Sequence, residues 1–372
     1  MNDRNAALLQ PKQHYLIHDG LRGVAALAIV VFHFMEWVFP DASKNFIGHG
    51  FLAVDFFFCL SGFVIGYAYD HRLPKMGVKT FFVSRLIRLH PLVLLGSVLG
   101  LVALLFDPFA SHAAGYSAGR ILLLFLCSAL LIPFPVMPER SFNLFSLNAP
   151  SWSLFWEYIA NIVYAFLLHR LGRPALFVLL FLSAAALCLV GYRSGNLLGG
   201  WSKDTFWDGG VRISYSFLAG LLLYRSSWIY KNRLGFIGLS LLLSLAFLLP
   251  SFSWNWLAEV LVVLFYFPLL VSLGAGTTLS SRLERVCMLS GKISYPLYMT
   301  HYAAIWMFGN YYTINKPEAG KLAVIVVTGT LLLLCVAYLV MKYYDIPVRS
   351  SLQAKRQQRW QQQEKGDKET HR

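Results

Sequence analysis

Ten apolar runs, each about 20 residues long, dominate this chain and limit what it can fold into. A helix of about 20 mostly apolar residues spans the hydrocarbon core of a bilayer. The mean hydropathy of +0.56 and a charged fraction of 13% exclude an ordinary water-soluble enzyme. The sequence predicts an all-α polytopic membrane protein with spans at 19–39, 50–69, 86–106, 152–169, 174–191, 209–225, 235–250, 256–273, 291–309 and 320–342.

A further apolar run at 121–132 is too short for a typical span and is followed by three prolines within six residues. We interpret it as a re-entrant or interfacial helix that does not cross. Lys and Arg then gather in alternate loops, which the positive-inside rule places in the cytoplasm. If residues 121–132 crossed, the later basic loops would face outward. We therefore expect about ten transmembrane helices with the N- and C-termini cytoplasmic.

The basic residues exceed the acidic ones by 32 to 18, a net charge of +14. In a soluble protein this excess would indicate nucleic acid. In this chain it indicates cytoplasmic loops that set topology and meet anionic membrane lipid, so no nucleic-acid partner is expected. We expect a cytoplasmic segment at 1–18, a transmembrane domain at 19–342, and a polar, basic, disordered or interfacial cytoplasmic tail at 343–372.

Two further features bear on processing and on metal binding. The first apolar run has no small-residue cleavage site after it, so we expect it to remain as a helix and not to be a signal peptide. The five cysteines are far apart in the sequence and form no CxxC motif. Neither a disulfide framework nor a metal site is expected.

Three ionisable residues inside the first apolar run stand out, because charge there is costly and marks candidate function. Arg22 and His33 are eleven positions apart, which is about 20° past three helical turns, so both lie on one face about 16 Å apart. Glu36 follows His33 at i+3 and can hydrogen-bond it and fix its tautomer. A snorkelling arginine and a structural histidine are the alternative, but the three together favour a catalytic role.

An Arg-x-x-Arg pair, Arg85 and Arg88, lies where the third run enters the membrane from the cytoplasm. The i, i+3 spacing places both guanidinium groups on one face. Two such groups suit a phosphate-bearing ligand. Topology alone explains many such pairs, so this signal is weak by itself.

Candidate acceptor-binding residues lie in the later runs. We expect the carboxylates of Asp55 and Glu157 to approach the outer leaflet, where carboxylates and the ring of Trp152 would suit a polyhydroxylated acceptor. A helix N-terminal charge and an interface anchor are the alternatives for Asp55 and Trp152. Tyr298 and His301 share one helix face, and a structural role is as plausible for His301 as a catalytic one. Together these residues suit the passage of a group from an inner donor to an outer acceptor.

Five segments occur in an order that resembles a known family: LRGVAALAIVVFHF, DFFFCLSGFVIGY, FFVSRLIRLHP, SWSLFWEY and GKISYPLYMTH. Over about residues 15–342 they resemble the membrane acyltransferase 3 family, whose members O-acylate sugars and glycans. The resemblance implies acyl-CoA, most often acetyl-CoA, as co-substrate and no metal. It also implies a sugar, surface polysaccharide or lipid-linked glycan as acceptor, in a bacterial inner membrane.

The resemblance also assigns roles to individual residues. His33 matches the family's essential histidine and would act as general base, and Arg22 matches its paired arginine. Arg85 and Arg88 match the pair that meets the CoA moiety, and Glu157 matches an acceptor-side glutamate. The family's usual tyrosine before proline is His90 in this chain. We expect the form without a fused C-terminal esterase-like domain.

Two other function classes use buried charge in the same way. A transporter or flippase would move a polar or glycolipid substrate without CoA, and a membrane sensor would bind a lipid-linked sugar without chemistry. Direct transfer and a covalent acyl-histidine both stay open, as do the acceptor, the position acylated, the acyl group and the oligomeric state.

Overall fold

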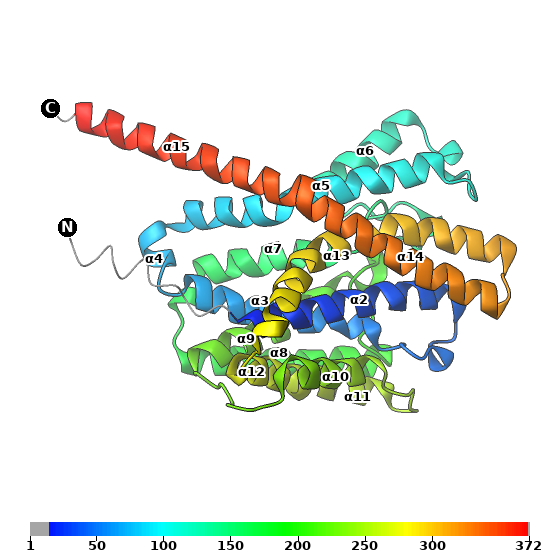
Figure 1. Ribbon diagram of the computed structural model, residues 1–372, viewed down its shortest axis with the longest axis horizontal. Helices are drawn as coiled ribbons and strands as arrows, with labels where there is room; N and C mark the ends of the chain where they lie inside the picture. The colour runs from blue at the N-terminus through cyan, green and yellow to red at the C-terminus, as the bar shows by residue number, and fades with distance from the viewer. Residues whose placement is uncertain (1–14, 371–372) are drawn as a thin grey trace.

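The computed structural model describes residues 15–370 and shows a bundle of helices that run roughly side by side (Figure 1). In the described part of the chain no β-strand forms, and only two isolated bridges occur. The helices are α2 (Leu16–Val38), α3 (Ala53–Tyr69), α4 (Leu73–Met76), α5 (Val78–Phe106), α6 (Ala118–Ala129), α7 (Ser151–Phe166), α8 (Arg173–Ser194), α9 (Phe206–Arg225), α10 (Gly235–Phe247), α11 (Asn255–Leu261), α12 (Phe267–Gly276), α13 (Ser281–Asn315), α14 (Ala319–Val340) and α15 (Ile346–Thr370).

The predicted all-α class is confirmed, and each of the ten predicted runs lies mostly within a helix or a helix pair. Among residues 15–370, six helical segments are long and apolar enough to cross a membrane by length and composition. Two of these contain a π turn, at Val262–Tyr266 between α11 and α12 and at Met341–Asp345 between α14 and α15. Ten spans and the cytoplasmic placement of both termini stay predictions. Of the predicted segment 1–18, residues 1–14 lie outside the described residues, and α2 already begins at Leu16.

Small residues bring the central helices close together. A Cβ atom on Gly62 of α3 would lie 2.0 Å from the carbonyl oxygen of Phe217, and one on Gly220 of α9 would lie 1.9 Å from that of Cys59. Glycine is therefore required on both sides of the α3–α9 contact. Such close backbone approach supplies the dispersion energy that holds membrane helices together where lipid removes the hydrophobic drive.

The segment between α6 and α7 enters the bundle as irregular backbone, and residues 143–150 are all buried. Asn148 donates to the carbonyl oxygen of Met299 at 3.2 Å and lies against Gly96, in the middle of α5. Irregular backbone is tolerated in such a place only where protein satisfies its polar groups. Helix α6, which covers most of the run predicted to be re-entrant, has 12 residues and is too short to span. The buried insertion is the segment after it.

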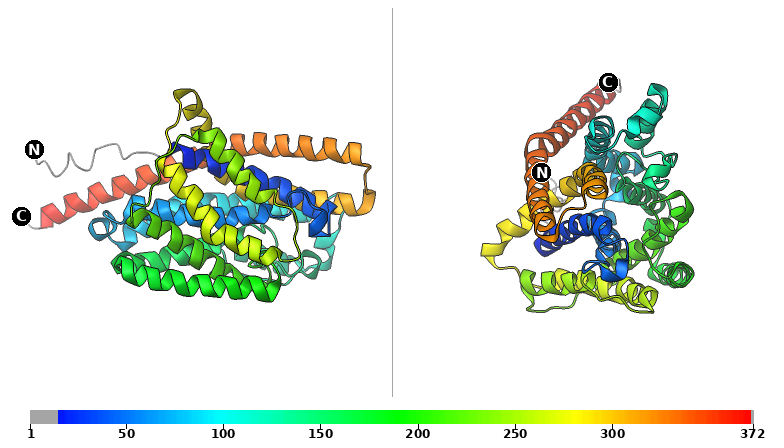
Figure 2. Two further views of the ribbon diagram at one scale, coloured as in Figure 1. Left: turned by 90° about the horizontal axis from the view of Figure 1, so that it is seen from below. Right: turned by 90° about the vertical axis from the view of Figure 1, so that its right-hand side faces the viewer.

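The tail, which the sequence predicts to be disordered or interfacial, is helical in its described residues. Helix α14 continues through the π turn into α15, which passes beside α5 and projects from the bundle (Figures 1 and 2). Two hydrogen bonds attach this segment to α5: Tyr344 Oη donates to the Pro91 carbonyl at 3.0 Å, and Arg356 Nη1 donates to Ser84 Oγ at 2.7 Å. The abundant Gln, Lys, Glu and Arg are good helix formers, so high polarity did not prevent a helix.

Candidate active site

A cavity of about 590 Å³ lies between α2, α3, α5, α7, α13 and the start of α15. Its volume is typical of a small-molecule site. Along α3 it extends from Val54 to Ile65, a rise of about 16 Å. Its ionisable lining residues are five cations and three carboxylates, so the wall is net cationic: Arg22, Arg85, Arg88, Lys292 and Arg349 against Asp19, Glu157 and Asp345. We call it the basic cavity.

Arg85 and Glu157 form an ion pair inside the basic cavity, with Nη2 and Oε1 2.6 Å apart. Ser61 Oγ donates to the same carboxylate oxygen at 3.0 Å. The sequence places Arg85 at the cytoplasmic end of its run and Glu157 near the outer leaflet, and this ion pair shows that the two residues do not lie at opposite ends of the bundle. The buried segment 143–150 starts α7 inside the bundle, which brings Glu157 to the level of Arg85.

The other predicted donor-binding cations also reach this cavity. Arg22 lies 3.7 Å from Asp19, one turn away on α2. Arg88 and Lys292 form no ion pair with any described residue, so their charges are available to a ligand. The structure thus brings Arg22, Arg85 and Arg88 together in one cavity. From the sequence they were related only by their guanidinium groups, which suit a phosphate-bearing donor.

His33 forms a second centre with Glu36 further along α2. His33 Nδ1 lies 2.7 Å from Glu36 Oε1, and because a carboxylate accepts, Nδ1 carries the proton. The other ring nitrogen, Nε2, makes no hydrogen bond with the described residues and is free to accept a proton. The two side chains are 19% and 32% exposed, so a substrate can reach them. The predicted hydrogen bond between them is present.

Aromatic residues of α13 surround the His33–Glu36 pair. The ring of His301 stacks on His33 with centroids 5.4 Å apart, and Tyr302 meets His33 edge-on at 4.8 Å. Tyr302 Oη also lies 3.5 Å from Glu36 Oε1. His301 donates through Nδ1 to the Leu297 carbonyl at 3.0 Å, which leaves its buried Nε2 without a partner among the described residues.

Tyr298 connects the two centres. Its side chain lines the basic cavity, its hydroxyl lies 2.7 Å from Ser153 Oγ, and its ring centroid is 6.1 Å from that of His301. His33 and Glu36 do not line the cavity. A contact path therefore leads from the cavity through Tyr298 and His301 to His33.

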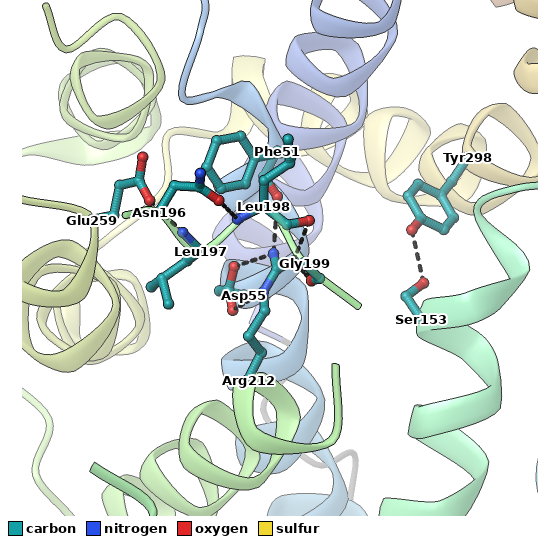
Figure 3. A network of polar contacts seen from close by, with 10 residues as sticks. All are labelled: Phe51, Asp55, Ser153, Asn196, Leu197, Leu198, Gly199, Arg212, Glu259 and Tyr298. Atoms are coloured by element: carbon teal, nitrogen blue, oxygen red, sulfur yellow. Dashed lines mark hydrogen bonds and ion pairs between the residues drawn. The ribbon is translucent and has the colours of Figure 1, made fainter. Parts of the chain in front are cut away.

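Asp55 and Trp152 belong to a separate buried network, and Figure 3 shows Asp55 with its partner Arg212. Both carboxylate oxygens of Asp55 accept from Arg212, at 3.1 and 2.6 Å, and the two side chains are 0% and 1% exposed. The Arg212 guanidinium also donates to the Gly199 carbonyl and lies 5.2 Å from the centre of the Trp152 ring. This arrangement ties α3, α7 and α9 together, and neither Asp55 nor Trp152 lines the basic cavity.

A buried arginine in the loop before α7 holds the inserted segment in place. Arg140 donates to the Ser146 carbonyl, and its guanidinium lies 4.8 Å from the centre of the Trp306 ring. Burial lowers the pKa of Arg140 to about 10, so it stays charged at neutral pH. A cation with only a carbonyl and an aromatic face as contacts is a costly feature, which fits a residue that fixes the loop.

Sequence reasoning missed Arg212, Ser61, Asp345 and Arg349. Arg212 lies inside the run 209–225, so the rule that selected Arg22 also applies to it. It lies near the start of that run, where the sequence alone indicates an outer loop charge. Asp345 and Arg349 follow the last run, and no local pattern sets them apart. Among residues 15–370, no group of three or more His, Cys, Asp and Glu side chains is placed to hold a metal ion.

Comparison with known proteins now adds independent findings. The chain is 34% identical over 166 residues to protein 2 in the picA locus of Rhizobium radiobacter, across 42% of this chain and 83% of that protein. It is 35% identical over 79 residues to proteins of Staphylococcus aureus strains COL and N315 that are provisionally named O-acetyltransferases. That match covers 20% of this chain and 12% of those proteins. No solved structure matches.

The family comparison covers most of the chain. A family model described as an acyltransferase domain, acyltransferase 3, matches residues 17–342. This range contains the His33–Glu36 pair and the arginines of α2 and α5, and it ends three residues before Asp345. Together with the long apolar helices, the match shows that the chain belongs to the acyltransferase 3 family and is a multi-pass membrane acyltransferase.

Proposed function

We propose that this protein transfers an acyl group, most simply acetyl, from cytoplasmic acyl-CoA to a hydroxyl of a sugar, surface polysaccharide or lipid-linked glycan in a bacterial inner membrane. The observation that carries the proposal is the His33–Glu36 pair, in which His33 Nε2 is free of hydrogen bonds with described residues. Only the ring of His301 separates His33 from Tyr298, which lines the basic cavity. A proton-accepting nitrogen and a phosphate-binding cavity are the two parts that such a transfer needs.

The basic cavity supports a CoA donor. The phosphates of CoA are anionic, and five cations line the wall, of which Arg88 and Lys292 have no ion pair with described residues. The wall near Tyr298, Ser153 and Val54 carries hydroxyl and apolar groups instead of charges. The uncharged pantetheine arm and thioester would therefore lie toward Tyr298, on the side of the cavity nearest His301.

The chemistry follows from the His33 tautomer. His33 Nε2 accepts the proton of the acceptor hydroxyl while the oxygen attacks the thioester carbonyl carbon. The tetrahedral intermediate then collapses, the carbon–sulfur bond breaks, and the imidazolium returns the proton to the leaving CoA sulfur. Glu36 accepts a hydrogen bond from Nδ1–H, which fixes the tautomer, and it stabilises the positive charge that develops on the ring. Arg22 would stabilise the negative charge of the donor.

The acceptor class rests on the relatives and on the family. The Staphylococcus aureus relatives carry O-acetyltransferase names, and O-acylation requires a hydroxyl acceptor. Glu36 is 32% exposed and would accept hydrogen bonds from sugar hydroxyls beside His33. Tyr302 and His301 pack against His33 and are buried, so they hold the pair in place beside the acceptor position.

A transfer assay in membranes tests the proposal. Membranes that contain wild type, His33→Ala or His71→Ala receive acetyl-CoA labelled in the acetyl group, and label is followed into the alkali-labile glycan fraction. His71 is an exposed loop histidine and serves as the matched control. We expect incorporation and stoichiometric CoA release with wild type and His71→Ala, and a loss of about 10²-fold or more with His33→Ala. Equal incorporation in all three removes His33 as the base.

A second assay, in liposomes, separates a transporter or flippase from a transferase. Purified protein in liposomes that moves substrate without CoA, and releases no CoA when acetyl-CoA is supplied, would contradict the transfer reaction.

A further inference from the structure

The family domain does not supply the whole wall of the basic cavity. The family match ends at residue 342, yet Asp345 and Arg349 also line the cavity. Both come from the segment where α14 passes through the π turn Met341–Asp345 into α15. The tail beyond the family domain therefore closes one side of the candidate donor site.

The π turn places Asp345 at this wall. A π turn inserts one residue into a helix, changes the direction of the side chains that follow, and is frequent at functional sites. Asp345 is 1% exposed and pairs through Oδ2 with Arg349 Nη2 at 2.6 Å. Its other oxygen, Oδ1, is buried without a hydrogen-bond partner in the described part of the chain. A buried, half-satisfied carboxylate is costly and indicates that a hydrogen-bond donor, such as an ordered water, completes it.

Arg349 is held in a defined orientation but retains binding capacity. Its Nε lies 3.4 Å from the Asp345 carbonyl oxygen and its Nη2 binds the Asp345 carboxylate. No described residue accepts from Nη1, and the side chain is 24% exposed. The charges of Arg88 and Lys292 lie in the same cavity. Arg349 thus adds a third guanidinium to the face formed by Arg85 and Arg88.

The tail is fixed to the helix that carries those two arginines. Tyr344 binds the Pro91 carbonyl and Arg356 binds Ser84, so the contacts flank Arg85 and Arg88 on α5. This attachment explains how a polar helix outside the family domain keeps a constant position at the cavity.

From these contacts we propose that Arg349 binds a phosphate group of the acyl donor, with Asp345 as the positioning residue that orients its guanidinium. The inference rests on the proposed function, because it takes the ligand of the basic cavity to be acyl-CoA. Beyond the proposed function, the inference assigns the segment after residue 342 to the donor site. Arginine suits this role because its planar fork binds phosphate through two parallel hydrogen bonds.

Binding measurements on the full-length protein in nanodiscs test this inference. Acetyl-CoA and acetyl-pantetheine, which carries no phosphate, are titrated into wild type, Arg349→Gln and Lys355→Gln. Lys355→Gln removes the same charge from an exposed position on the same helix and is the matched control. We expect Arg349→Gln to weaken acetyl-CoA binding about 10-fold or more and to leave acetyl-pantetheine binding unchanged. Lys355→Gln should bind both like wild type.

Two further variants test the positioning role. Asp345→Asn should weaken acetyl-CoA binding while keeping the side-chain volume, and Arg349→Lys should recover part of the affinity because it restores charge but not the planar fork. A structural role alone would change the affinity for both ligands equally, and that result would overturn the inference.

The outcomes separate this inference from the proposed function. If wild type binds acetyl-CoA and Arg349→Gln binds it equally well, the tail inference is wrong and the CoA donor stands. If wild type does not bind acetyl-CoA, the proposed donor is wrong and the inference falls with it.

Discussion

Arg85 on α5 and Glu157 on α7 meet at 2.6 Å inside the basic cavity, although 72 positions separate them in the sequence. Glu157 also accepts from Ser61, so one carboxylate connects α3, α5 and α7. The pair fixes the orientation of Arg85, while Arg88 keeps its charge free of ion pairs with the described residues. The two arginines of one motif therefore differ: an ion pair holds Arg85, while Arg88 has no such partner among the described residues.

This difference predicts a loss of stability in Glu157→Gln. Removing one partner of a buried pair leaves an uncompensated charge, which costs about 3–5 kcal/mol. The Arg85 side chain is 6% exposed and Glu157 18%, so we expect about 3 kcal/mol, seen as a lower melting temperature in nanodiscs. Glu284→Gln, at an exposed acid on α13, should melt like wild type. An unchanged melting temperature for Glu157→Gln would mean that the pair contributes nothing to the fold.

Arg88→Gln should impair donor binding without this loss of stability. Arg88 lines the cavity and forms no ion pair with described residues, so its removal leaves no partner unsatisfied. We expect the KM for acetyl-CoA to rise about 10-fold, with a smaller change in kcat and an unchanged melting temperature. Arg173→Gln, at the exposed start of α8, is the control. An unchanged KM would restrict Arg88 to a role in topology.

Asp55→Asn should destabilise the protein because Asp55 is the only carboxylate that pairs with Arg212 among residues 15–370. Both side chains are almost fully buried, so the loss is expected at about 3–5 kcal/mol. Asp55→Leu combined with Arg212→Met should recover much of that stability, because apolar residues replace both charges. Thermal unfolding of the single and double variants measures this. If Asp55→Asn keeps wild-type stability but loses acceptor binding, Asp55 binds the acceptor, as the sequence predicts, and does not mainly stabilise the fold.

Local relationships were predictable from the sequence, and relationships across the bundle were not. The His33–Glu36 bond follows from i, i+3 spacing on one helix, and the helices follow from apolar runs. The meeting of Arg85 with Glu157 depends on the buried segment 143–150, whose irregular backbone has no periodicity to read. The helix of the tail was not predictable from its polarity, because helix propensity and the hydrogen bonds to α5 account for its structure.

Glu36→Gln should lower kcat while leaving donor binding intact. The amide can present its NH₂ group to His33 and so stabilise the wrong tautomer, and it no longer stabilises the imidazolium electrostatically. We expect kcat to fall at least 10-fold with the KM for acetyl-CoA unchanged, since Glu36 does not line the basic cavity. Glu318→Gln, an exposed acid before α14, should behave like wild type. A rise in KM alone would place Glu36 in binding and not in proton transfer.

The central claim is that His33 carries out the chemistry and not the binding of the donor. The most direct measurement determines kcat and the Kd for acetyl-CoA on the same nanodisc preparation of His33→Gln. We expect kcat to fall by about 10²–10⁴-fold while Kd stays at the wild-type value, because His33 lies outside the basic cavity. A kcat within a few-fold of wild type, or a loss explained entirely by a weaker Kd, would contradict it.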